Sequence, residues 1–180
     1  MNKWQSMRYV SDMIEPFLVK QLQRKYHSHF VFRASDYDSF ERLVQINKFY
    51  YNQIKYVDLI KENWSAIDII YFKIKELPEY VPTQEYFRFM DNLRTENKTI
   101  IDIELYEVKT VTSNKPSILS VKTDFLQKEL KKLNKIMKCI KVYLSGQLSF
   151  NLVETNLEDE DFVVQTHYGR KGYYIGEKHS

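Results

Sequence analysis

The spacing of apolar residues predicts helices and strands that alternate along the chain. Residues three and four apart are apolar over 7–22, which is typical of the buried face of a helix. Residues 66–74 are almost continuously apolar and β-branched, which is typical of a strand buried on both faces. Residues 99–110 alternate between apolar and polar side chains, which indicates a strand with two different faces.

The remaining patterns complete a mixed order of helices and strands. Pro16 either kinks the first helix or begins a shorter second one. The other predicted elements are a strand at 29–33, a long helix from Asp38 or Ser39 to about Glu62, a short helix at 83–94, a helix at 123–138 capped by Thr123 or Asp124, a hairpin of strands 140–144 and 148–152, and a last strand at 162–165. This order predicts an α/β fold with a central mixed β-sheet flanked by helices. We expect a single domain over 1–180, with a mobile tail at 166–180.

Composition is that of a soluble globular protein. Hydrophobic residues make up 43% of the 180 residues and charged residues 28%, which excludes a disordered or collagen-like chain. Cys139 is the one cysteine, so an internal disulfide and a multi-thiolate zinc site are excluded and a reducing compartment is expected. No apolar run approaches the roughly 20 residues that span a bilayer. We therefore expect no membrane partner and a cytoplasmic location, in the host cell if the source is a virus.

Positive charge is concentrated in one stretch of the chain. The net charge is +3, but residues 122–141 contain seven lysines and two acids, a local charge of +5. A basic stripe on the predicted helix would contact nucleic-acid phosphates. Alternatively, it is the solvated back of an amphipathic helix whose core side is Leu126, Leu130, Leu133 and Met137. The lysines expected to bind nucleic acid are Lys122, Lys128, Lys131, Lys132 and Lys135.

Three ionisable residues on two predicted strands indicate a metal site. Asp68 interrupts an apolar strand, and a buried unpaired carboxylate is costly unless it has a partner or a metal. Glu107 and Lys109 lie two apart on the next strand and therefore share one of its faces. Mg²⁺ prefers one or two carboxylates together with waters and substrate oxygens. The carbonyl of Val108 would add an oxygen ligand if the strand bends there.

Asp68 on one strand, with Glu107-Val108-Lys109 at the end of the next, resembles the PD-(D/E)XK nuclease superfamily. That superfamily includes restriction endonucleases and archaeal Holliday junction resolvases. The resemblance implies that Asp68 and Glu107 bind Mg²⁺ or Mn²⁺ and that Lys109 positions or activates water. It also implies a further acid from the first helix, for which Glu15 is the candidate.

The same resemblance implies an αβββαβ core with insertions at 36–62 and 75–98. The sequence departs from the superfamily at Ile67, because a proline usually precedes the aspartate. Two further acid-x-Lys tripeptides occur in the chain, and neither closes an apolar strand. In the alternative interpretation, the three candidate residues are ordinary ion-paired or solvent-facing side chains.

These observations predict a metal-dependent nuclease that hydrolyses phosphodiester bonds of DNA, with Mg²⁺ or Mn²⁺ as its cofactor. A homodimer is an expected partner state, because nucleases that cut both strands of a duplex often pair two sites. Two alternatives stay open. One is a non-catalytic nucleic-acid-binding or assembly protein on the same fold, and the other is an interaction protein without a nucleic-acid partner.

Overall fold

The computed structural model describes residues 3–28, 30–36, 56–74, 100–111, 116–144, 150–168 and 174–178. These residues form a five-stranded sheet of order β1-β2-β3-β5-β6 and a three-stranded sheet of order β4-β7-β8. The predicted mixed α/β fold with a central mixed sheet is therefore confirmed. Most of the two expected insertions, and the predicted helix at 83–94, lie outside the described residues.

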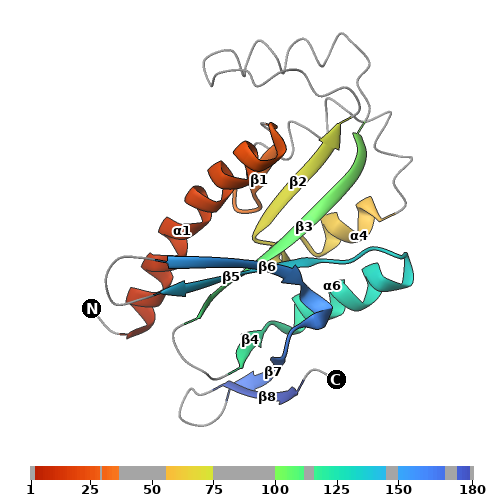
Figure 1. The fold of residues 1–180 in the computed structure, drawn as a ribbon. Helices are drawn as coiled ribbons and strands as arrows, with labels where there is room; N and C mark the ends of the chain where they lie inside the picture. The colour runs from red at the N-terminus through yellow and green to blue at the C-terminus, as the bar shows by residue number, and fades with distance from the viewer. Residues whose placement is uncertain are drawn as a thin grey trace. The chain divides into compact units, whose positions relative to one another are not determined.

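Helices and strands follow one another along the chain in a mixed order (Figure 1). They are α1 (Lys3–Tyr26), β1 (Val31–Arg33), α4 (Val57–Glu62), a 3-10 turn (Trp64–Ala66), β2 (Ile69–Ile74), β3 (Ile100–Val111), β4 (Ser117–Leu119), α6 (Val121–Lys132), β5 (Lys138–Leu144), β6 (Phe150–Asn156), a second 3-10 turn (Leu157–Asp159), β7 (Phe162–Tyr168) and β8 (Tyr174–Lys178). No described helix is both long enough and apolar enough to cross a membrane.

The chain divides into two compact units. The first unit contains Met1–Val57 and Asp68–Glu104, and the second contains Asp58–Ile67 and Leu105–Ser180. Strand β3 contributes residues to both units. The expectation of one domain concerns the whole chain and stays a prediction.

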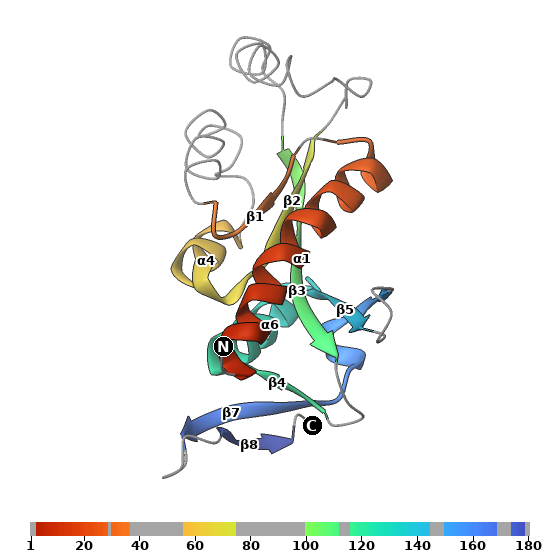
Figure 2. The ribbon, with the colours of Figure 1, turned by 90° about the vertical axis from the view of Figure 1, so that its left-hand side faces the viewer.

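In the first unit, α1 packs against β1, and the Tyr26 ring of α1 stacks on the Tyr71 ring of β2 (Figures 1 and 2). Helix α1 runs without interruption for 24 residues through Pro16, so the proline does not begin a second helix. Strands β1 and β2 pair antiparallel, and the Phe72 amide donates to the Phe30 carbonyl at 2.9 Å. Ile69, Ile70 and Phe72 of β2 are buried, which confirms the prediction of a strand buried on both faces.

The second unit joins β3 to β5 through α6. Strands β3 and β5 are parallel, with Glu107 opposite Cys139 and Lys109 opposite Lys141. Parallel neighbours need a crossover connection, and α6 provides it. Strands β5 and β6 pair antiparallel over seven residues, so the predicted hairpin is confirmed as a strand pair. Its connecting residues 145–149 lie outside the described part of the chain.

Helix α6 begins and ends earlier than the sequence pattern predicted. Its N-cap is Ser120, whose hydroxyl accepts from the Thr123 amide at 3.0 Å, so the prediction of Thr123 or Asp124 as the cap was wrong. The helix ends at Lys132, because the chain turns at Asn134 with a φ of 56°, a left-handed conformation that asparagine tolerates. The predicted extension to residue 138 is therefore wrong. Leu133, expected in the core, is exposed.

The smaller sheet combines β4, which precedes α6, with the two last described strands of the chain. Strand β4 pairs parallel with β7, and β7 pairs antiparallel with β8. The sequence pattern does not predict β4, because a three-residue strand has too little alternation to detect. The expected mobile tail at 166–180 stays a prediction, and within it the structure describes the end of β7 and all of β8.

Candidate functional site

Glu107 and Lys109 form an ion pair on strand β3. Lys109 Nζ lies 2.5 Å from Glu107 Oε1, and the exposed fractions of the two side chains are 20% and 7%. The prediction that these residues share one face of the strand is confirmed. Removing a charge from water is costly, and the adjacent ammonium offsets that cost for the Glu107 carboxylate.

The strand register extends this face onto β5 and β6. Residues paired across neighbouring strands project to the same side of a sheet, which places Lys141 beside Lys109 and Thr155 beside Cys139. Lys141 forms an ion pair with Glu160, and the Thr155 hydroxyl donates to Glu160 Oε1 at 2.7 Å. The polar sheet face, as we call it, is the following set of residues: Glu107, Lys109, Lys141, Thr155 and Glu160.

Lys141 and Glu160 were not among the residues predicted from the sequence. Lys141 belongs to a strand whose alternation places it on the same side as Cys139, and that alternation was the available signal. Glu160 follows β6 in an acidic run, and no sequence spacing connects it to a lysine of β5. Cys139 itself is buried, as expected for a small core residue.

Asp68 lies immediately before β2, because the residues ahead of it form a 3-10 turn (Trp64–Ala66) rather than the first part of the strand. Its side chain is half-buried, and its backbone carbonyl accepts from the Ala34 amide at 2.8 Å. Asp68 belongs to the first unit and Glu107 to the second. Their convergence on one metal ion stays a prediction.

Glu15, the candidate fourth acid, lies on α1 and contacts a cation. Its Oε2 atom accepts from Arg33 Nε of β1 at 3.1 Å, and both side chains are largely buried. This contact gives Glu15 a structural partner within the first unit. A role for Glu15 beside a metal would require that contact to open or to be shared.

Val108 was expected to offer a carbonyl oxygen to a metal where the strand bends. The β3–β5 register runs without a shift from Tyr106 to Val111. In a regular strand the carbonyls lie in the plane of the sheet and point toward neighbouring strands, away from the side-chain faces. The ligand role of Val108 therefore depends on a local bend and stays a prediction.

The lysines expected to bind nucleic acid have contacts within the second unit. Lys122 donates to the Ser65 hydroxyl at 3.1 Å, Lys128 lies 2.9 Å from Asp124, Lys131 lies 2.8 Å from Glu158 and Lys132 lies 2.5 Å from Glu129. The last three lysine side chains are 60–69% exposed. The hydrogen bond that Lys131 donates to Glu158, together with the negative charge of Glu158, raises the pKa of Lys131. Lys135 follows the end of α6, so it does not share the helical stripe.

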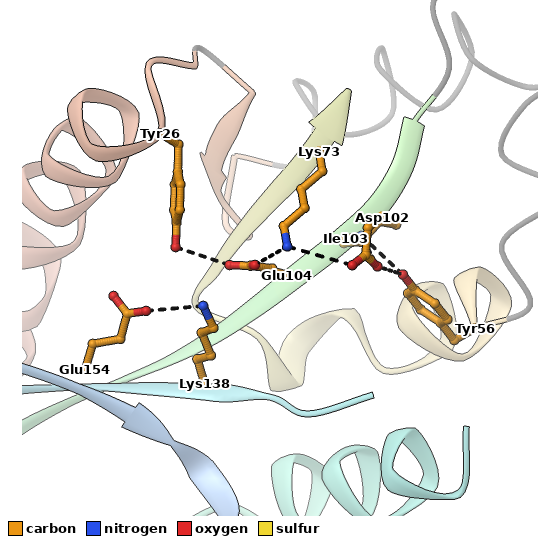
Figure 3. A network of polar contacts seen from close by, with 8 residues as sticks. All are labelled: Tyr26, Tyr56, Lys73, Asp102, Ile103, Glu104, Lys138 and Glu154. Atoms are coloured by element: carbon orange, nitrogen blue, oxygen red, sulfur yellow. Dashed lines mark hydrogen bonds and ion pairs between the residues drawn. The ribbon is translucent and has the colours of Figure 1, made fainter. Parts of the chain in front are cut away.

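A second polar network lies in the first unit (Figure 3). Lys73 of β2 contacts two carboxylates of β3, Asp102 at 3.8 Å and Glu104 more closely. The Tyr26 hydroxyl donates to Glu104 at 3.2 Å, and the Tyr56 hydroxyl donates to Asp102. The alternation of β3 predicted that Asp102 and Glu104 share a face, but nothing in the sequence identified the three partner side chains.

Tyr71 borders this network and has a shifted pKa. Its ring stacks on that of Tyr26 with centroids 4.3 Å apart. Burial raises the pKa of Tyr71 above its ordinary 10.0, and the neighbouring Glu104 charge raises it further. The phenol is therefore neutral over the physiological range.

Figure 3 also shows the pair formed by Lys138 and Glu154 in the second unit. Their side chains lie 3.3 Å apart, and the Lys138 ammonium is 5.6 Å from the centre of the Tyr106 ring. Lys138 pairs in register with Tyr106, so this pair lies on the side of the β5–β6 hairpin opposite Lys141. It provides a matched comparison for the polar sheet face.

Comparison with known proteins identifies no relative. The chain matches no family model, no curated protein and no solved structure. The described residues also contain no group of three or more histidine, cysteine, aspartate or glutamate side chains placed to hold a metal ion. The side chains themselves and their contacts are therefore the basis for a functional assignment.

Proposed function

We propose that this protein is a metal-dependent nuclease that hydrolyses DNA, with Glu107 and Lys109 at its centre. The observation that carries the proposal is the largely buried Glu107–Lys109 pair on one face of β3, a strand that pairs with β5 inside the central sheet. This pair corresponds to the acid and lysine of the tripeptide on which the resemblance to PD-(D/E)XK nucleases depends.

The order of elements also supports the proposal. Elements α1, β1, β2, β3, α6 and β5 follow the αβββαβ order of that superfamily, with two additions: α4 between β1 and β2, and β4 before α6. The parallel pairing of β3 with β5 is the feature that requires the helical crossover. These observations support a nuclease-like core, which stays part of the proposal.

The side chains fit a magnesium ion if Asp68 and Glu107 converge. Two carboxylates with waters and substrate oxygens form the hard donor set that Mg²⁺ prefers, and no third acid is required. When bound, such an ion would lower the pKa of a water and neutralise charge on the phosphate. Glu107 and Asp68 would hold the ion, and the Lys109 ammonium would orient the attacking water and stabilise negative charge.

The test uses substitutions that keep the contacts of the site as far as possible. Glu107→Gln retains an acceptor for Lys109, Lys109→Arg retains a cation, and Asp68→Asn keeps the side-chain shape. Each is expected to lower Mg²⁺- or Mn²⁺-dependent cleavage of plasmid and linear duplex about 100-fold or more. Circular dichroism and thermal unfolding check that each variant is folded.

The matched control is the pair Glu154–Lys138, which has the same residue types on the β5–β6 hairpin. Glu154→Gln and Lys138→Arg are expected to leave cleavage within about twofold of the wild-type rate. Equal cleavage by the Glu107 and Glu154 variants would refute the assignment. Absence of cleavage by the wild-type protein with either metal would do so as well.

A second candidate function is a non-catalytic nucleic-acid-binding or assembly protein on the same fold. The observation that favours it is that Lys109 already neutralises Glu107. Such a protein would bind DNA with a salt-dependent affinity and leave it intact in Mn²⁺. Binding without nicking would select this function over the nuclease. The expected homodimer stays a prediction under either function.

A further inference from the structure

An acidic segment, residues 157–161, is fixed within the second unit by its backbone and by one apolar side chain. Leu157 is buried, and its amide donates to the Met137 carbonyl at 2.8 Å. The 3-10 turn (Leu157–Asp159) continues this anchor, and the Asn156 side chain donates to Asp159 at 2.8 Å. The acids that follow Leu157 are therefore held in place.

Two carboxylates of the acidic segment contact lysines from two different elements. Glu158 lies 2.8 Å from Lys131 of α6, and Glu160 pairs with Lys141 of β5. Thr155 donates a further hydrogen bond to Glu160 at 2.7 Å. One short segment thus supplies the negative partner for a lysine of α6 and for a lysine of the polar sheet face.

The position of Lys141 connects the acidic segment to the candidate site. Lys141 is the register partner of Lys109, so Glu160 lies on the same face as the Glu107–Lys109 pair. The side chains of Lys141 and Glu160 are only 18% and 13% exposed. A carboxylate and a phosphate both accept charge-assisted hydrogen bonds from an ammonium group. The Glu160 carboxylate therefore occupies the Lys141 ammonium, which a phosphate bound beside Lys109 would otherwise contact.

We propose that the acidic segment is an internal competitor for the phosphodiester backbone, so that DNA must displace Glu160 from Lys141 and Glu158 from Lys131. This inference rests on the proposed function, because DNA is the ligand that it names. The Glu158–Lys131 contact is solvent-exposed and opens readily. The Glu160–Lys141 contact is the less exposed of the two, so it sets most of the competition.

The test measures binding of a short fluorescein-labelled duplex by anisotropy, without divalent metal, so that no cleavage intervenes. Glu160→Gln is expected to tighten binding about tenfold, because a phosphate can then reach the Lys141 ammonium without displacing a carboxylate. Glu158→Gln is expected to tighten binding by less. Lys141→Gln is expected to weaken binding, and Glu160→Gln added to Lys141→Gln is expected to produce no tightening.

Two controls separate displacement from a general gain of positive charge. Asp161→Asn makes the same charge change within the same run, and Glu154→Gln breaks a glutamate–lysine pair on the other face of the hairpin. Both are expected to change affinity less than about threefold. Equal tightening by the Glu160 and Glu154 variants would overturn the proposal.

The remaining outcomes distinguish this inference from the nuclease proposal. Tighter binding by the Glu160→Gln variant supports the competitor even if the wild-type protein never cleaves, in which case the nuclease proposal alone fails. Unchanged binding with loss of Mg²⁺-dependent cleavage would overturn the competitor and make Glu160 part of the catalytic machinery. No binding by the wild type or by any variant would overturn the competitor, and normal cleavage would then leave the nuclease proposal standing.

Discussion

The two halves of strand β3 solve the same electrostatic problem in different ways. The first half, in the first unit, carries Asp102 and Glu104, and both contact Lys73 and tyrosine hydroxyls. The second half, in the second unit, carries Glu107 and Lys109, which neutralise each other. The polar positions are even-numbered in the first half and odd-numbered in the second.

This difference separates a structural network from an exchangeable one. In the first half, each carboxylate accepts a hydrogen bond from a neutral tyrosine hydroxyl and also contacts the Lys73 ammonium. The Ile103 amide donates a further hydrogen bond to Asp102 at 2.9 Å. Such a network fixes geometry, because each oxygen has a directed donor. In the second half, Lys109 has the Glu107 carboxylate as its counterion, and the neighbouring Lys141 of β5 has that of Glu160. A phosphate could replace a carboxylate there without leaving a lysine unpaired.

The largest expected effect comes from breaking the Glu107–Lys109 pair. Lys109→Met leaves the Glu107 carboxylate largely buried without its ammonium, which should lower the free energy of unfolding by about 3 kcal/mol. Adding Glu107→Leu should restore most of that loss, because no charge then remains buried. Urea unfolding measures both. Lys132→Met breaks an exposed pair and should lower the free energy of unfolding by at most about 0.5 kcal/mol. An equally small loss for Lys109→Met would show that the Glu107–Lys109 pair behaves like an exposed one.

A smaller effect is expected from the tyrosine hydroxyls of the first half. Tyr56→Phe removes a hydroxyl that donates to Asp102 and accepts from the Ile103 amide, so unfolding should become easier by about 1 to 2 kcal/mol. Tyr26→Phe should cost about 1 kcal/mol, because its ring stack on Tyr71 survives. Tyr143→Phe is the control, since that side chain is exposed. If all three variants unfold alike, the first-half network is not structural.

The smallest effect concerns alkaline pH and Tyr71. Its pKa is raised in the folded protein, mainly by burial and then by Glu104, so the unfolded chain loses the phenolic proton first. The stabilisation is complete below pH 10.0 and is lost as pH rises through the higher folded pKa. Urea unfolding on either side of that pH should show a flatter decline for Tyr71→Phe than for the wild type. Identical declines would show that Tyr71 does not contribute to the pH dependence.

Local sequence patterns predicted the strands. They did not predict side-chain contacts between residues that are far apart in the sequence. The alternation over 99–110 predicted β3 and the shared face of Glu107 and Lys109, because side-chain direction in a strand depends only on parity. The end of α6 was missed because the lysine and leucine spacing continues past Asn134, where the backbone turns. The contacts of Glu160 and Lys73 join separate elements, and no spacing rule encodes them.

The way the chain passes between the two units has a practical consequence. It crosses from one to the other after Val57, after Ile67 and after Glu104, so neither unit is a single continuous stretch of sequence. A fragment that ends at residue 104 would lack the second half of β3, and one that begins at residue 105 would lack Ala66, whose carbonyl accepts from the Thr123 hydroxyl at 3.3 Å. Truncation within these 180 residues is thus a poor way to isolate either unit, and point substitution in the intact 180-residue chain is the better tool.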